Sequence, residues 1–282
     1  MSEGLGTTTY WDSLGFDYGV VDKYEDFINL IVRKAQTEVR SEKPEDWETC
    51  CYYVDPSGVI ACVFMHKNGI SDTNFGIFGQ PGTRFYTFQV TPGLGAGQYL
   101  LPDPNSPNDP EAVVGSSPFF LEYLDPLAYP LPVGEIDGRF GQTFADYRLS
   151  AVATQMEVYA DLDTWAQKVL DTSRLDPKDY LSVLGEIDSP SIEYLDTIED
   201  SLDKVHGGAI LGGICLDVEE RTNALTGNKW LCATLDQGQV QLKLALPANI
   251  SPRPVPGNVI FGRAILSGAT ERWEEGLKGL LP

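Results

Sequence analysis

The sequence predicts an α+β protein with an N-terminal helix plus antiparallel strands and a C-terminal small β-barrel or half-barrel. Three observations lead to this fold class: a helical spacing of apolar residues near the start, a hairpin pattern directly after it, and four strand patterns near the end. A hydrophobic content of 42% with 11% aromatic residues is typical of a chain that folds around a packed core.

The charge is distributed unevenly along the chain. The protein has 41 acidic and 20 basic residues and a net charge of −21, yet residues 205–282 contain seven of each kind. Residues 1–204 therefore carry the whole net charge. A charge of this sign repels phosphate backbones and anionic lipid and favours cationic partners. Because no apolar run is long enough to span a membrane and no secretory signal is visible, we expect a cytoplasmic protein without membrane contact.

The first part of the chain predicts one helix after a flexible N-terminus at residues 1–19. Asp22 is the expected N-cap, and Glu25 completes a pattern like that of a capping box. The apolar residues that follow recur at helical spacing, namely Phe27, Ile28, Ile31, Val32, Ala35 and Val39. This helix opens an expected α+β domain at residues 20–160.

A β-hairpin is predicted next. The β-rich runs Thr49–Val54 and Val59–His66 flank Asp55-Pro56-Ser57-Gly58, in which proline and glycine occupy the positions that a type I turn favours. Residues 84–90 are a further strand candidate. The stretch 91–146, rich in proline and glycine, is interpreted as a long functional loop, a disordered excursion, or a region of short strands that the pattern conceals.

The middle of the chain is strongly acidic. After a strand candidate at 147–159 and a short helix at 164–170, residues 157–204 hold 13 acidic residues against four basic ones. Apolar residues recur among the acids, which favours short amphipathic helices with a solvated acidic face. We expect residues 161–204 to be an acidic helical connector between two domains.

Residues 205–282 are predicted to form a segment like the oligonucleotide/oligosaccharide-binding (OB) barrel. The strand candidates are 209–219, in which Gly212 and Gly213 allow a sharp bend, then 229–235, 239–246 and 259–266. Strand, loop, hairpin, link and strand is the order of an OB barrel. A fifth strand is missing, since residues 271–282 have a helical pattern. Either the barrel is open or a strand from residues 1–204 closes it.

The layout resembles an uncharacterised family of bacterial proteins. The matching pieces are Tyr24-Glu25-Asp26-Phe27, Asp55-Pro56-Ser57-Gly58, and Leu225-Thr226-Gly227 before Trp230. The resemblance implies a capped N-terminal helix, a hairpin, a strand before a short helix, and a C-terminal OB-like segment. It implies no activity, because none of the matching motifs is chemical.

The sequence assigns no catalytic, cofactor-binding or metal-binding residue. The pocket candidates are His66, at the end of an apolar strand, His206, at the domain junction, and Asp217. No nucleophile elbow and no zinc-ligand spacing occurs, and the five cysteines lie in apolar runs typical of buried thiols. For both histidines a structural or merely exposed role is the favoured interpretation.

Three functions remain open at this level. The first is a non-catalytic binding or accessory protein that engages another protein through the acidic face (161–203) or the neutral barrel. The alternative is a small-molecule enzyme or ligand-binding protein, with a pocket between the two parts that the proline- and glycine-rich stretch covers. The third is OB-type nucleic-acid binding, which the charge disfavours; its candidates are Trp230 and Phe261 for stacking, with Lys229, Lys243 and Arg263 for the backbone.

Overall fold

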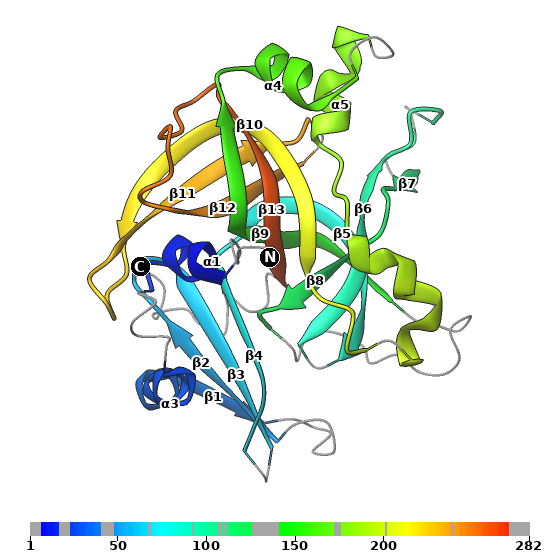
Figure 1. Ribbon diagram of the computed structural model, residues 1–282. Coiled ribbons are helices and arrows are strands. Elements are labelled where there is room, and N and C mark those ends of the chain that lie inside the picture. Colours follow the sequence, from blue (N-terminus) through cyan, green and yellow to red (C-terminus); the bar gives the residue numbers. More distant parts are fainter. Residues whose placement is uncertain are drawn as a thin grey trace.

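The computed structural model describes residues 7–16, 23–40, 48–66, 69–91, 93–106, 109, 112–125, 141–171, 176–200, 202–238 and 240–270. The chain is an α+β protein, as the sequence predicted, and strands make up most of its regular structure. The described helices are α1 (Thr7–Ser13), α3 (Tyr24–Lys34), α4 (Leu162–Val169), α5 (Tyr180–Leu184) and the 3₁₀ segments Pro177–Asp179 and Pro190–Asp200. The strands form a four-stranded sheet and a nine-stranded mixed sheet (Figure 1).

The four-stranded sheet is antiparallel and follows chain order. It consists of β1 (Thr37–Arg40), β2 (Thr49–Val54), β3 (Val59–His66) and β4 (Gly69–Ile77). The predicted hairpin is confirmed with its bounds, since β2 and β3 cover the two predicted strands. In its turn the Asp55 carboxylate accepts hydrogen bonds from Ser57 N and the Tyr53 hydroxyl, and Gly58 adopts a φ of +93°. Helix α3 packs on this sheet through Phe27, Ile28 and Ile31.

The nine-stranded sheet has the order β5-β9-β12-β11-β10-β13-β8-β6-β7, with additional pairings β5–β6 and β9–β13. Its strands are β5 (Gln80–Thr91), β6 (Leu94–Pro102), β7 (Val113–Gly115), β8 (Phe119–Tyr123), β9 (Gln142–Tyr159), β10 (Gly208–Thr222), β11 (Lys229–Asp236), β12 (Gln241–Pro247) and β13 (Val259–Thr270). The additional pairings close two rings of five strands, β5-β6-β8-β13-β9 (the first ring) and β10-β11-β12-β9-β13 (the second ring). The two rings share β9 and β13.

The two rings follow one pairing pattern. In each of the runs β5-β6-β8-β9 and β10-β11-β12-β13, the first strand pairs with the second and the fourth, and the second pairs with the third. The third strand then pairs in parallel with the fourth strand of the other run, β8 with β13 and β12 with β9. Ser150 of β9 lies opposite Ser267 of β13 at the centre of this arrangement, with their hydroxyl oxygens 3.0 Å apart. The chain thus repeats one four-stranded unit and exchanges the last strands.

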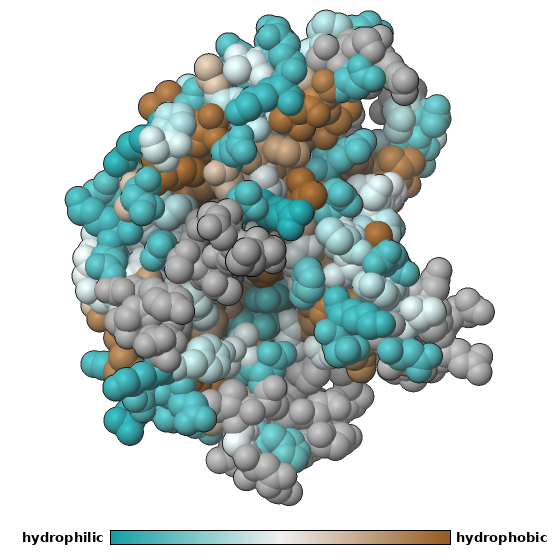
Figure 2. Space-filling model, viewed as in Figure 1, coloured by the Kyte–Doolittle hydropathy of each residue, from teal (hydrophilic) through white to brown (hydrophobic). Residues whose placement is uncertain are grey.

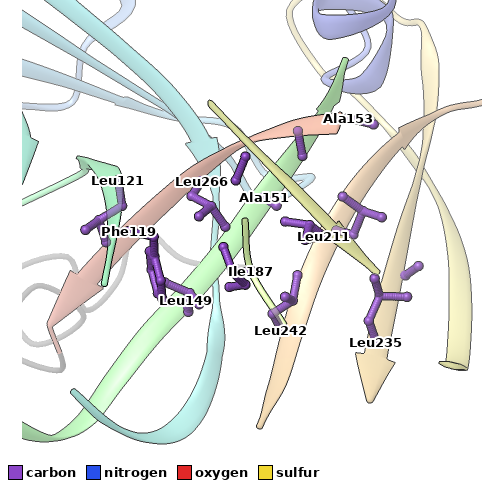
Figure 3. Packing of buried hydrophobic residues seen from close by; sticks show 14 of the residues in the cluster. Phe119, Leu121, Leu149, Ala151, Ala153, Ile187, Leu211, Leu235, Leu242 and Leu266 are labelled. Carbon is purple, nitrogen blue, oxygen red and sulfur yellow. The ribbon is translucent and has the colours of Figure 1, made fainter. Parts of the chain in front are cut away.

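One hydrophobic cluster extends through both rings. Phe85, Phe119 and Tyr147 contribute from the first ring, and leucines of β10, β11 and β12 contribute from the second. Figure 3 shows Leu149 and Ala151 of β9 together with Leu266 of β13 in this cluster. Because the core is continuous, the rings stabilise each other.

Several expectations need correction. Residues 7–16, assigned to a flexible N-terminus, form α1 and the turn after it, and place Leu14 and Phe16 in the core. Helix α3 ends at Lys34, and Val39 lies in β1, because the chain from residue 36 onward pairs with β2. Lys23 stands at the N-cap without a side-chain bond, and the expected cap Asp22 lies outside the described residues. The predicted helical pattern at 271–282 also lies outside them.

The stretch 91–146 contains β6, β7, β8 and the start of β9, so the third interpretation of it, concealed short strands, is correct for the described residues. Strand β9 is the fifth strand that the C-terminal segment lacked, since it pairs with both β12 and β13. The expected boundary at 161–204 therefore does not separate two sheets. Within this connector, Asp161 caps α4 through Thr164 N at 2.7 Å.

Candidate binding pocket

A cavity of about 390 Å³ lies where the two rings and the connector meet. Its walls come from the end of β6 and the segment after β7, from α5 with the residues after it, and from the turn between β11 and β12. Figure 1 places α5 at the top and β6 and β7 at the right, and Figure 2 shows hydrophobic surface in the region of α5. The lining residues are Tyr99, Leu101, Ser116, Ser117, Phe119, Lys178, Leu181, Ser182, Gly185, Glu186, Ile187, Gln237, Gly238 and Val240. We call this cavity the seam pocket.

The connector wall is fixed to both sheet and core. Tyr180 and Leu184 of α5 are buried in a cluster with Trp165. Asp188 exchanges two backbone hydrogen bonds with Ile210 of β10, at 2.9 and 2.7 Å, and so attaches the segment after α5 to the sheet. Ile187 joins the core shared by the two rings, beside Leu149 and Leu242 (Figure 3). The floor of the seam pocket is therefore also the outer layer of this core.

Glycine is required where α5 meets the β11–β12 turn. A Cβ on Gly185 would lie 2.0 Å from the carbonyl oxygen of Gln237, a distance that no side chain can occupy. The turn itself is closed by a bond from Gln237 N to Val240 O at 3.0 Å, and Gly238 adopts a φ of +86°. The close approach of backbone to backbone sets the width of the pocket on this side.

Two buried polar side chains on the floor of the seam pocket, Tyr99 and Gln237, are hydrogen-bonded to each other. Gln237 and Tyr99 are 3% and 4% exposed. The Gln237 Nε2 donates to the carbonyl of Gly212 at 3.0 Å, and the Tyr99 hydroxyl donates to Gln237 Oε1 at 3.1 Å. Because a backbone carbonyl can only accept, the amide nitrogen must face Gly212, and the tyrosine must donate to the amide oxygen. Burial raises the pKa of Tyr99, so its hydroxyl keeps its proton.

The rim is hydroxylic and charged. Ser116 N donates to Tyr99 O, and Ser116 Oγ accepts from Tyr99 N, both at 3.0 Å, so this serine attaches the segment after β7 to β6. Lys178 and Glu186 are exposed, and the Lys178 ammonium lies 3.2 Å from the Asp176 carboxylate. The pocket therefore combines a neutral, mostly apolar interior with charges of both signs at its mouth.

The three residues that the sequence singled out lie apart from the seam pocket. His66 is partly buried at the end of β3, in the other sheet. His206 is exposed before β10, and its Nδ1 accepts from Gly208 N at 3.0 Å. A second described cavity, of about 460 Å³, lies beside Gly15 and Asn228. His66, His206 and Asp217 line neither this cavity nor the seam pocket.

Asp217 belongs instead to a polar row across three strands. It lies opposite Thr234 of β11, which lies opposite Lys243 of β12. Thr234 Oγ1 donates to Asp217 Oδ2 at 2.7 Å and accepts from Lys243 Nζ at 2.5 Å. Such cross-strand pairs stabilise a sheet by their contacts. Asp217 is exposed at one end of the row, Thr234 is buried in its middle, and none of the three residues lines a described cavity.

The two aromatic candidates for base stacking pack inside the protein, and the cysteines are buried. Trp230 is fully buried and donates to Ser57 Oγ at 3.2 Å, and Phe261 packs against Trp165. All five cysteines are free and buried. Burial raises the pKa of the Cys51 and Cys215 thiols to about 11, so a thiolate nucleophile is disfavoured at these two positions.

The described part of the chain holds no group of three or more histidine, cysteine, aspartate or glutamate residues that could bind a metal ion. None of its helices is both long enough and apolar enough to cross a membrane.

Sequence reasoning missed the residues that build the seam pocket. Gln237 lies in Asp236-Gln237-Gly238, which was interpreted only as a tight connection, and Tyr99 lies in the stretch 91–146. A large amide between a strand and a turn glycine is a signal that could have identified Gln237, since exposed turns favour shorter polar residues. No local pattern could have paired it with Tyr99, 138 residues away.

No protein-family model, no curated protein and no solved structure matches this chain.

Proposed function

We propose that this protein is a non-catalytic binding protein that holds a small, mainly apolar molecule in the seam pocket. The observation that carries the proposal is the cavity where both rings and the connector meet, in which the buried polar residues Tyr99 and Gln237 lie beside the apolar residues Phe119, Ile187 and Val240. Its volume falls within the range of about 300–1,000 Å³ that is usual for ligand sites. Of the functions that the sequence left open, this proposal takes up the ligand-binding protein, but it places the pocket at the seam and not near His66, His206 and Asp217.

The lining supports binding more than catalysis. Its described residues include no histidine and no cysteine, and the buried polar groups Tyr99 and Gln237 are uncharged and already hydrogen-bonded. A general acid or base needs a titratable group at the reacting atoms, and Lys178 and Glu186 are exposed at the mouth of the pocket. Fixed neutral groups serve to orient a ligand.

We also infer from the strand order that each ring is an OB-type barrel, and this inference raises the question of nucleic-acid binding. The pairing pattern of each ring, with its third strand parallel to the fifth, is the OB order, and the fifth strand comes from the other half of the chain. OB barrels bind nucleic acid on the face of their second and third strands. In the second ring, α1 packs on this face, where Trp230, Cys232 and Ala245 are buried with Leu14.

In the first ring the same face is covered by the connector. Ala96 of β6 and Phe120 of β8 pack in one cluster with Ile192, Tyr194 and Leu195 of the 3₁₀ segment. Both OB faces are thus occupied by the protein itself, at least in part, and the net charge of −21 repels phosphate. This leaves the seam pocket as the better supported site.

A protein partner at the acidic connector stays a prediction. Ile192, Tyr194 and Leu195 of the 3₁₀ segment pack against the first ring, and Glu193 and Asp200 are exposed. Such a surface suits a basic partner.

The proposal is tested by filling the pocket. Leu181 is half-buried in its wall, so Leu181→Trp places an indole in the cavity. In a saturation-transfer NMR screen of neutral aromatic fragments, we expect hits on the unmodified protein and at least a tenfold loss of affinity in this variant. The matched control is Leu202→Trp, at a residue 47% exposed outside the pocket, which should leave binding unchanged. Equal binding by both variants, or no fragment bound by the unmodified protein, would contradict the proposal.

A further inference from the structure

We infer that the ligand of the seam pocket carries a neutral carboxamide-like group, one that donates and accepts hydrogen bonds side by side. This inference rests on the proposed function. It follows from the hydrogen-bonding capacity that the two buried residues on the floor, Tyr99 and Gln237, still have after bonding to each other and to the backbone.

The capacity can be counted from the chemistry of each group. The Gln237 amide has two N–H donors, of which one serves Gly212, and its oxygen can accept twice, of which one place serves Tyr99. The Tyr99 hydroxyl donates its only proton to Gln237 Oε1, so its oxygen can form further hydrogen bonds only as an acceptor. One donor on Gln237 and neighbouring acceptors on Tyr99 and Gln237 therefore remain for a ligand, and both residues line the seam pocket.

A carboxamide complements this pair of residues. Its carbonyl accepts from the free N–H of Gln237, while its NH₂ group donates to the Tyr99 oxygen. A ketone can satisfy only the first contact and a hydrocarbon neither. Because buried polar groups without partners are costly, a ligand that leaves either group unmatched binds more weakly.

Charged ligands are disfavoured at the same place. The described floor contains no charged side chain, and an ion that enters it would lose hydration without a buried counter-charge. Lys178 cannot supply one, since it is exposed at the rim and pairs with Asp176. The rest of the ligand is apolar, and in contact with Phe119, Ile187 and Val240.

Four probes of nearly equal size test the inference: benzamide, acetophenone, benzoate and benzylammonium. Their dissociation constants are measured by NMR titration against the unmodified protein. We expect benzamide to bind tightest, acetophenone about five-fold more weakly for one lost hydrogen bond, and both ions at least tenfold more weakly. Equal affinity for all four would overturn the inference and leave the proposed function standing. No binding by any probe would overturn both.

Two variants assign the contacts. Tyr99→Phe removes only the hydroxyl, so benzamide should fall to the affinity of acetophenone, which itself stays unchanged. Gln237→Met removes the N–H donor, so we expect benzamide and acetophenone each to bind this variant about five-fold more weakly than they bind the unmodified protein. Circular dichroism confirms that each variant is folded, and Tyr99→Phe alone decides the matter if Gln237→Met unfolds. A preference for benzamide that survives Tyr99→Phe would overturn the inference.

Discussion

Replacing Asp55 by alanine is expected to lower the free energy of unfolding by about 3–5 kcal/mol. The Asp55 carboxylate is fully buried and accepts from Ser57 N at 2.8 Å, from the Tyr53 hydroxyl at 2.7 Å and from Ala224 N at 3.0 Å. Ala224 belongs to the loop between β10 and β11, so this side chain joins the hairpin to the nine-stranded sheet. Alanine would leave three donors without this acceptor, of which the Tyr53 hydroxyl and Ser57 N belong to buried residues and Ala224 N to an exposed one.

Urea unfolding followed by circular dichroism measures this effect. Asp55→Asn keeps one acceptor oxygen and should have an intermediate effect. Asp176→Ala is the control, since Asp176 is exposed and caps only a short 3₁₀ turn, and its cost should stay near about 0.5–1 kcal/mol. A loss of less than about 1 kcal/mol for Asp55→Ala would show that the carboxylate does not hold the two sheets together.

Glu122→Gln is expected to stabilise the protein at alkaline pH and to have little effect near pH 5. Glu122 lies on β8 and is partly buried, and this burial, together with the charge of Asp72, raises its pKa to about 8. The folded state therefore keeps a proton that the unfolded state releases near pH 4.5. Its contribution to stability is complete below this value and is lost as the pH rises through 8.

The difference between unmodified protein and variant should grow by about 2–3 kcal/mol between pH 5 and pH 9, because a pKa raised by one unit corresponds to about 1.4 kcal/mol and part of the side chain is exposed. Denaturant unfolding at four pH values measures it. Glu186→Gln, at an exposed position, is the control and should show no such trend. A difference that stays constant with pH would mean that Glu122 is ionised in the folded protein.

The local elements were predictable from the sequence, and the way they join was not. The hairpin and the strands at 229–236 and 259–270 follow from alternation and turn residues, which are local signals. The partners of β9 are not local. Val152 lies opposite Ala245 and Ile265, about a hundred residues further along, and no pattern within β9 indicates that it serves both rings.

The pocket escaped prediction for a related reason. His66, His206 and Asp217 drew attention because their residue types often carry chemistry, yet each belongs to a different local arrangement. Gln237 and Tyr99 are ordinary residues that become a site only because β6 and the β11–β12 turn meet. A site that depends on tertiary contacts between neutral residues leaves no local signature.

The side-chain amide signals of Gln237 test the central claim, that the seam pocket is a binding site, most directly. In ¹H–¹⁵N spectra this pair of signals is identified by its absence in Gln237→Met, and it is followed while benzamide is added. We expect it to shift with a single saturating curve, together with the backbone amides of Gly185 and Gly238, which line the same cavity. Unchanged Gln237 signals while benzamide shifts residues elsewhere, such as the Asp217–Thr234–Lys243 row, would contradict the claim.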